Sequence, residues 1–133
     1  MFYDFSFTIP ANTLEADPLR EDVNLTHGVI HRVEISFPPG CAGLVHFQLV
    51  QGLHQVWPTN PGGSFNNDAY TIVINEFYDM TEEPFTITFL GWNLDDTYPH
   101  TLEIRFGILP MIVIKPEETF LQAFKKLLTR LRL

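Results

Sequence analysis

The chain has 133 residues, of which 45% are hydrophobic, and this is enough for one domain with its own core. Its 16 acidic and 8 basic residues give a net charge of −8, which disfavours binding to the phosphates of a nucleic acid. The single cysteine, Cys41, excludes an internal disulfide and a cysteine-based zinc site, and no stretch approaches the about 20 apolar residues that span a bilayer. The N-terminus lacks the basic flank and the apolar run of a secretory signal, so we expect a protein that folds in a reducing cytoplasm.

Apolar and polar residues alternate through most of the first 110 residues, which is the period of strands with one buried face. In residues 3–9, for example, large apolar side chains alternate with Asp4, Ser6 and Thr8. Gly28 is expected at a bulge or bend within the second strand. Turn-rich loops are predicted at residues 10–22, 58–69, 79–84 and 93–99. Strands are predicted at residues 3–9, 23–37, 45–49, 53–57, 70–75, 85–89 and 101–108, and the pattern allows an eighth at 111–114.

Seven or eight short strands separated by turns predict an all-β fold, an antiparallel β-sandwich that occupies residues 1–115. The strand spacing and the long loops favour a jelly roll or a similar Greek key. An immunoglobulin domain is disfavoured because its Cys–Trp–Cys core pattern is absent.

From Pro116 the period changes from that of a strand to that of a helix, which predicts a C-terminal amphipathic α-helix over residues 116–133. Residues 1–114 carry 14 acidic and 3 basic residues, whereas residues 115–133 carry 2 acidic and 5 basic ones. The acids come first in the helix and the bases later, so both complement the helix dipole. The apolar stripe contains Phe120, Phe124, Leu127, Leu128 and Leu131, and the basic residues of the second half are Lys125, Lys126, Arg130 and Arg132.

A helix of about 15 residues is near the lower limit of stability in water, so its apolar stripe needs a partner surface. The helix could fold back onto the sandwich, pack with copies of itself through its near-heptad spacing, or lie on an anionic membrane or an acidic partner. We interpret it as an assembly element. The apolar residues would form the contact, and the four basic residues would steer it to an acidic surface, such as the body of a neighbouring copy.

The loop at residues 58–69 is the longest turn-rich stretch and suggests an alternative, a carbohydrate-binding module. Sugar-binding sandwiches stack an aromatic ring on the sugar while amides and carboxylates hold its hydroxyl groups. Such a lectin-like site could be formed by Trp57, Asn60, Asn66, Asn67, Asp68 and Trp92. The competing interpretation is that the two tryptophans cap the ends of the core.

The sequence contains no G-x-S-x-G, P-loop or dinucleotide-binding motif, and none of its three serines stands in a nucleophile context. His27 and His31 would lie about 13 Å apart on a strand at ~3.3 Å per residue, which is too far for joint ligation of a metal unless a bend at Gly28 shortens the distance. His46 and His54 lack the neighbouring ligands of a cupin site. We therefore predict no enzymatic activity, no metal and no cofactor. Calcium is the alternative, since it binds loop carboxylates such as those of Glu82, Glu83, Asp95 and Asp96, although no EF-hand spacing is present.

Residues 28–50 (GVIHRVEISFPPGCAGLVHFQLV) and 55–60 (QVWPTN) resemble small β-sandwich proteins of tailed-phage structural modules. The resemblance lies in a compact sandwich that is rich in Phe and Pro, lacks catalytic residues and has a terminal extension. It implies a virion component such as a capsid decoration or cement protein, made in the host cytoplasm. It also implies a homo-oligomer, with a trimer favoured, that contacts other virion proteins such as a capsid protein.

Overall fold

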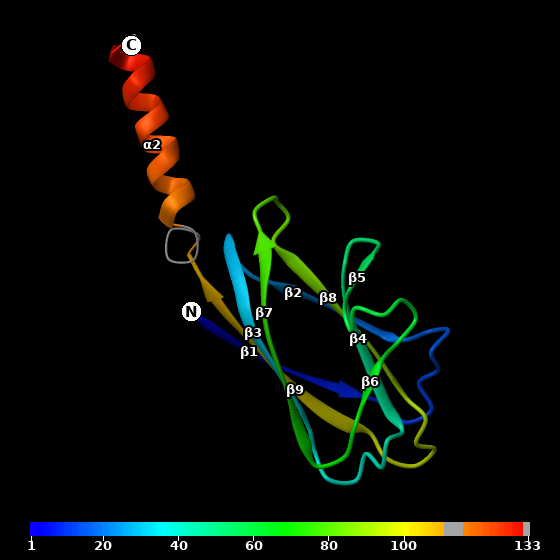
Figure 1. Cartoon of the computed structure of the whole chain (residues 1–133). Coiled ribbons are helices and arrows are strands. Elements are labelled where there is room, and N and C mark those ends of the chain that lie inside the picture. Colours follow the sequence, from blue (N-terminus) through cyan, green and yellow to red (C-terminus); the bar gives the residue numbers. More distant parts are fainter. Residues whose placement is uncertain (111–115, 132–133) are drawn as a thin grey trace.

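The computed structural model describes the backbone of residues 1–110 and 116–131, and the side chains of residues 1–110 and 121–131. Within these ranges the chain forms two facing antiparallel sheets and a C-terminal helix (Figure 1). The predicted all-β sandwich with a C-terminal amphipathic helix is thereby confirmed. The strand allowed at 111–114 lies outside the described residues.

The described residues form nine strands, separated by turns that are rich in Pro, Gly, Asn and Asp. In chain order these are β1 (Phe2–Ile9), β2 (Leu19–Asn24), β3 (Gly28–Phe37), β4 (Val45–Gln51), β5 (His54–Trp57), β6 (Phe65–Asn66), β7 (Tyr70–Met80), β8 (Thr86–Asn93) and β9 (His100–Leu109).

The chain passes from one sheet to the other at most of its connections. One sheet has the strand order β1-β9-β3-β7, and the other has the order β2-β8-β4-β5, with the short β6 also paired to β4. The first strand pairs with the last, so that Phe2 lies opposite Gly107 and Ile9 lies opposite His100. Neighbours within each sheet are therefore distant in sequence, and this strand order is that of a jelly roll.

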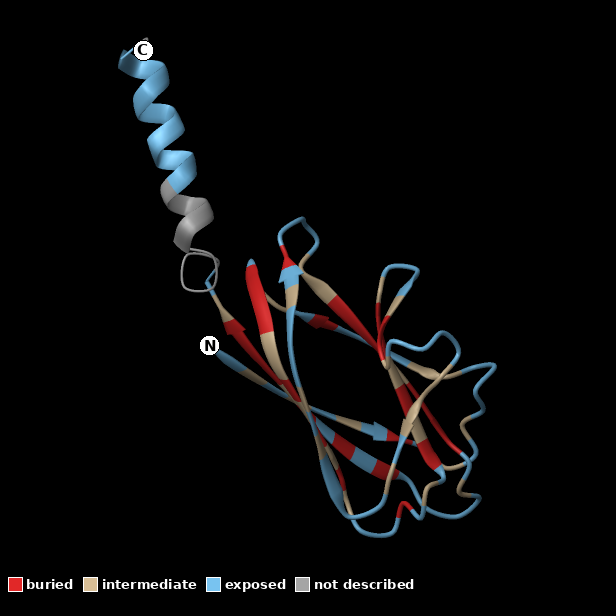
Figure 2. Cartoon of the chain, in the orientation of Figure 1, coloured by how far each residue is buried: buried red, intermediate tan, exposed pale blue. Residues whose placement is uncertain are grey.

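The core fills the space between the two sheets, and strands such as β4 and β9 direct alternate side chains into it. Ile104 of β9, Phe47 of β4 and Phe89 of β8 are fully buried. The ring centroid of Phe89 lies 5.8 Å from that of Phe47 and 4.9 Å from that of Phe7 on β1, so side chains of both sheets interdigitate. Figure 2 shows the resulting alternation of buried and exposed residues along β9. Burial of each such side chain contributes about 1.5–3 kcal/mol relative to exposure.

Several predicted boundaries were wrong, and each has a physical reason. Residues 19–22 were predicted in a loop but begin β2, which pairs with β8. Three consecutive charged residues at 20–22 obscure the alternation, because they separate the half-buried Leu19 from the buried Val23. β7 continues to Met80, into the predicted 79–84 turn. The predicted 58–69 loop contains the short strand β6, which pairs with β4.

The irregularity of β3 lies between Ile30 and Arg32 rather than at Gly28, which begins the strand. Gly28 has a φ of 151°, and a Cβ atom there would lie 2.6 Å from the carbonyl oxygen of Leu109. Glycine therefore allows β3 and β9 to approach closely at this end of the sheet.

The helix α2 (Pro116–Leu131) begins where the change of period predicts it, with proline in its first turn. Figure 1 shows α2 extending away from the two sheets, from the end of the sandwich at which β9 finishes. Of the predicted contact residues, Arg132 and the side chain of Phe120 lie outside the described parts of the chain.

Candidate functional site

The apolar stripe of α2 is exposed to solvent in the single chain. Its described members are each between 37% and 57% exposed, and Figure 2 shows this part of the helix in the colour of exposed residues. Lys125, Lys126 and Arg130 are also exposed, and no acidic residue occurs among residues 121–131. The helix thus displays an apolar surface beside three positive charges. The described stripe consists of Leu121, Phe124, Leu127, Leu128 and Leu131.

The sandwich carries the opposite charge, and two of its three arginines are occupied by carboxylates. Arg105 lies 2.9 Å from Glu103, 3.6 Å from Asp4 and 3.8 Å from Glu34 across the outer face of the first sheet. Arg32 lies 2.9 Å from Glu34. These pairs neutralise the cations of that face, so the other acidic residues give the sandwich surface its net negative charge.

A groove of about 640 Å³ gathers four of these acids at the end of the sandwich from which the chain leaves β9. The pairing of Gly28 with Met80, and of Val29 with Leu109, places the β7–β8 turn at that same end. The sequence predicts only a turn at residues 79–84, and no local pattern indicates the groove because it also needs Asp22 of the distant strand β2. The acids that line it are Asp22, Asp79, Glu82 and Glu83.

Trp57, the central residue of the alternative carbohydrate site, lies in the core with 2% of its surface exposed. Its indole Nε1 donates a hydrogen bond of 3.2 Å to Glu76 on β7, and its ring lies 5.3 Å from that of Tyr78. The ring therefore packs between the sheets, where it is inaccessible to a sugar. Burial also raises the pKa of the Tyr78 hydroxyl, which donates a hydrogen bond to Gln51.

The polar residues of the 58–69 loop form hydrogen bonds that shape the loop itself. Asp68 accepts hydrogen bonds from the backbone N–H groups of Gly40 and Ala42, at 2.9 and 3.0 Å. The amide of Asn66 donates to the carbonyl of Gly43, and Asn67 accepts from the N–H of Asp68. The carbonyl of Asn60 accepts from the N–H of Gly63. These contacts tie the loop to the 38–44 turn.

Trp92 lies on the other face of the same sheet, so the structure does not bring the two tryptophans together. Trp57 pairs with Leu49, which faces the core, whereas Trp92 pairs with His46, which faces outward. The rings of Trp92 and His46 are parallel, with centroids 5.5 Å apart, and Trp92 is only 5% exposed. Burial lowers the pKa of His46, against a smaller opposing effect of the Glu15 carboxylate.

The opposite end of the sandwich contains a hydrogen-bonded cluster around Asp95. One carboxylate oxygen of Asp95 lies 2.9 Å from Nε2 of His100, and the other accepts the backbone N–H groups of Thr97 and Tyr98. The hydrogen bond with His100, followed by those backbone groups, lowers the pKa of Asp95. The amide of Asn93 fastens the same loop to the carbonyls of Ile9 and Tyr98.

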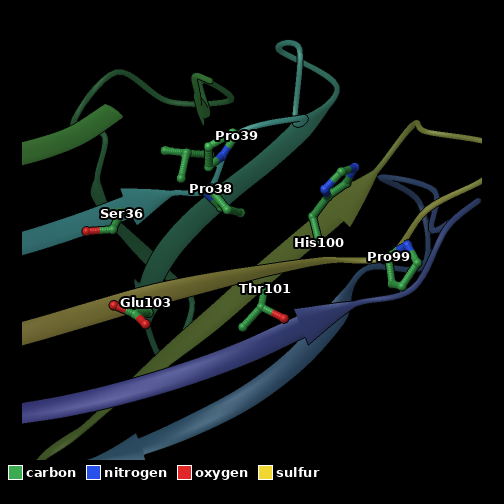
Figure 3. Close-up of a pocket in the computed structure, with 8 residues that line it drawn as sticks. Ser36, Pro38, Pro39, Pro99, His100, Thr101 and Glu103 are labelled. Carbon is green, nitrogen blue, oxygen red and sulfur yellow. The ribbon is translucent and has the colours of Figure 1, made fainter. Parts of the chain in front are cut away.

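A hollow of about 510 Å³ beside this cluster brings Ser36 and His100 into one lining (Figure 3). Together with Asp95 these are the residue types of a hydrolase triad, but Ser36 does not form a hydrogen bond with His100. The hydroxyl of Ser36 pairs with that of Thr71 on the outer face, 2.9 Å away, while His100 pairs with Asp95. Figure 3 shows the Ser36 hydroxyl directed away from the imidazole of His100.

Exposed aromatic side chains on the first sheet were not predicted. Phe77 of β7 is 71% exposed and Phe2 of β1 is 65% exposed. The ring of Phe2 meets that of His31 edge-on at 6.0 Å, over the glycine at position 107. The alternation in residues 70–80 places Phe77 on the solvent side, so this pattern could have predicted its exposure.

The described residues contain no group of three or more His, Cys, Asp and Glu side chains that could hold a metal ion. Within the same residues, no helix has the length and apolar character needed to cross a membrane.

No protein-family model matches the chain, and no curated protein matches it either. The crystal structure of FeII HppE is similar over 80% of this chain, with 6% sequence identity and a TM-score of 0.41. The chain covers 43% of that structure's chain, which is less than half of its length. The crystal structure of PirA is similar over 79% of this chain and 94% of its own, with 16% identity and a TM-score of 0.36. At these scores neither likeness carries a functional argument, and the function rests on the residues themselves.

Proposed function

We propose that the chain is a non-enzymatic structural protein whose helix α2 docks its sandwich onto a neighbouring subunit. The observation that carries this proposal is the exposed stripe of α2. Five large apolar side chains lie on one helical face, and each keeps more than a third of its surface in water. A 16-residue helix gains most of its stability from packing of such a face, so a partner surface is required.

Charge supports an acidic partner surface, such as the sandwich of another copy. The described part of α2 carries Lys125, Lys126 and Arg130 without an acid, while residues 1–114 carry 14 acidic and 3 basic residues. Complementary charges of this kind accelerate encounter and fix orientation, while the apolar contact supplies most of the affinity. The role of the basic residues is thus to orient a hydrophobic contact.

Hydrogen bonding among the polar side chains of the sandwich supports a structural role without catalysis. Ser36, His100 and Asp95, the residues closest in type to a catalytic set, are each engaged in separate structural hydrogen bonds. Together with the resemblance to sandwich proteins of phage structural modules, this supports a decoration or accessory protein of a virion. Gene neighbourhood tests that part: adjacent capsid and portal genes would support it, and a metabolic operon would contradict it.

Deletion of residues 116–133 tests the docking role directly. We expect the shortened chain to retain the circular dichroism spectrum of a β-sandwich and to have a smaller mass by light scattering than the assembly that the full chain forms. The mass of the full chain also shows whether the favoured trimer forms. A shortened chain that forms the same assembly as the full chain would contradict the proposal.

A synthetic peptide of residues 116–133 provides a second test that leaves the protein intact. Added in excess, it should compete for the docking surface and dissociate the assemblies. The matched control is a peptide of the same composition in which the apolar residues no longer share one face. If both peptides dissociate the assemblies equally, charge alone explains the competition, and this result would contradict a hydrophobic contact.

A further inference from the structure

Strand β7 forms one edge of the sheet β1-β9-β3-β7, and among the described residues no strand pairs with its outer side. It has 11 residues, which makes it longer than the other edge strands β1, β2 and β5. Seven of its residues are exposed, and Figure 2 shows most of the strand in the colour of exposed residues. Such an edge presents a row of backbone N–H and C=O groups that can pair with another strand.

The other edges of the sandwich carry the protection that edge strands usually have. β5 has four residues, and β2 carries three consecutive charged residues at 20–22. β1 carries Asp4, which pairs with Arg105 of the neighbouring strand. By contrast, Tyr70–Asn75 of β7 reads Tyr-Thr-Ile-Val-Ile-Asn and contains no charge, proline or glycine. This composition has high β-propensity and offers nothing that would discourage pairing.

We propose that β7 pairs antiparallel with β7 of a second copy, which joins the two four-stranded sheets into one continuous sheet. The pairing would also cover exposed apolar surface, since Tyr70 is 59%, Val73 42% and Phe77 71% exposed. It goes beyond the proposed function, because this surface belongs to the sandwich and does not involve α2. Antiparallel pairing of identical strands gives a closed two-fold contact.

The charges on β7 are compatible with a second copy when the pairing is centred away from Glu76. With the two-fold axis at Val73, Thr71 lies opposite Asn75 of the other copy, and Tyr70 lies near its Glu76, which follows Asn75 where the pairing with β3 shifts register. This places a phenol beside a carboxylate. It also separates the two Glu76 residues by six positions, or about 20 Å at ~3.3 Å per residue, so the carboxylates do not face each other. The strand is therefore complementary to itself in this register.

Cysteine cross-linking of the full chain tests the register. In Val73→Cys the two introduced thiols would lie on the axis, where opposed Cβ atoms are about 4.5–5.5 Å apart. In Thr71→Cys they would be four positions, or about 13 Å, apart. We expect a short bifunctional thiol reagent to convert most of Val73→Cys to a covalent pair and to leave Thr71→Cys single. A mixture of Thr71→Cys and Asn75→Cys should cross-link. The native Cys41 is buried and does not compete, and the unmodified chain is the background control.

Ser6→Cys on the edge strand β1 serves as a matched control for random collision, since Ser6 is also exposed. Absence of a covalent pair in Val73→Cys would overturn the proposal, as would equal yields for Val73→Cys, Thr71→Cys and Ser6→Cys. In a further variant, Val73→Lys, two ammonium groups would meet on the axis. We expect this variant to lose the paired species by light scattering when the apolar residues of α2 are also made polar. Cross-linking of Val73→Cys should persist when the apolar residues of α2 are made polar. If it disappears, α2 is the only contact and the pairing of β7 is refuted.

Discussion

Replacement of Leu127 and Leu131 by glutamine should weaken association between copies while the sandwich stays folded. These side chains are 51% and 57% exposed, so about half of each remains to be buried by a partner. Complete burial of a leucine is worth about 1.5–3 kcal/mol, which gives about 1 kcal/mol for each half and about 2 kcal/mol per helix. At about 1.4 kcal/mol per factor of ten, Kd should rise about 30-fold if one helix docks at each contact and about 700-fold if two dock. Glutamine has nearly the helix propensity of leucine, so α2 itself should persist.

Sedimentation equilibrium over a concentration series measures this Kd, and a thermal melt followed by circular dichroism checks the sandwich. The matched control is Lys126→Gln, which changes an exposed residue on the side of α2 opposite the stripe. An exposed charge pair is worth about 0.2–1 kcal/mol, so the control should change Kd by no more than about 5-fold. An unchanged Kd in the double variant would refute the reasoning. Equal weakening by the control would show that charge, and not burial of the stripe, drives association.

Three further predictions concern the sandwich. Asp95→Asn should destabilise it at neutral pH, because the lowered pKa of Asp95 shows that its charged form is favoured in the folded state. That stabilisation is fully present above about pH 3.9, the pKa of Asp95 in the unfolded state, and is lost as pH falls through the lower pKa of the folded state. Chemical denaturation curves of the variant and the parent should therefore converge in acid. In the same denaturation assay, Gly28→Ala should cost more than Gly52→Ala, for which the strain of a positive-φ alanine predicts about 1 kcal/mol. A Cβ atom at position 28 would lie 2.6 Å from the carbonyl oxygen of Leu109, whereas one at position 52 would have no neighbour within 4 Å. Cys41 is fully buried, and burial raises its pKa. A thiol reagent should therefore label Cys41 only as fast as the protein unfolds. Rapid labelling of the native protein would contradict this placement.

The sequence predicted the fold well where one side of a strand faces the core. Alternation placed residues of β1, β4 and β9 on their buried faces, because burial there follows a period of two. It failed at two edge strands whose residues are mostly exposed: β2 has charged residues at consecutive positions, and β7 was predicted to end early. In β7 the polar pair Asn75-Glu76 and the outward Phe77 resemble a loop, although the strand resumes its pairing with β3 at Tyr78 after a shift in register.

The candidate sites differ in the same way, because one depends on a local sequence pattern and the other on long-range contacts. The position of the apolar stripe on α2 follows from helical periodicity, which is local. The burial of Trp57 depends on Glu76, 19 residues away, and the separation of Trp57 from Trp92 depends on their pairing with opposite faces of β4. Such long-range contacts leave no pattern in the sequence near either tryptophan. Because polar loops adjoin them, the carbohydrate-binding alternative assumed that both tryptophans are exposed, whereas the fold buries them.

The pairing of β1 with β9 has a consequence for the order of folding. Phe2 meets Gly107 and Ile9 meets His100, so about 100 residues must be synthesised before the first strand gains its partner. Loop closure over such a distance is slow, and until then the aromatic side of β1, with Tyr3, Phe5 and Phe7, has no completed sheet to cover it. A nascent chain interrupted before β9 would expose this segment to chaperones and to aggregation. Because α2 follows β9, its apolar stripe emerges from the ribosome only after the strand that completes the sandwich.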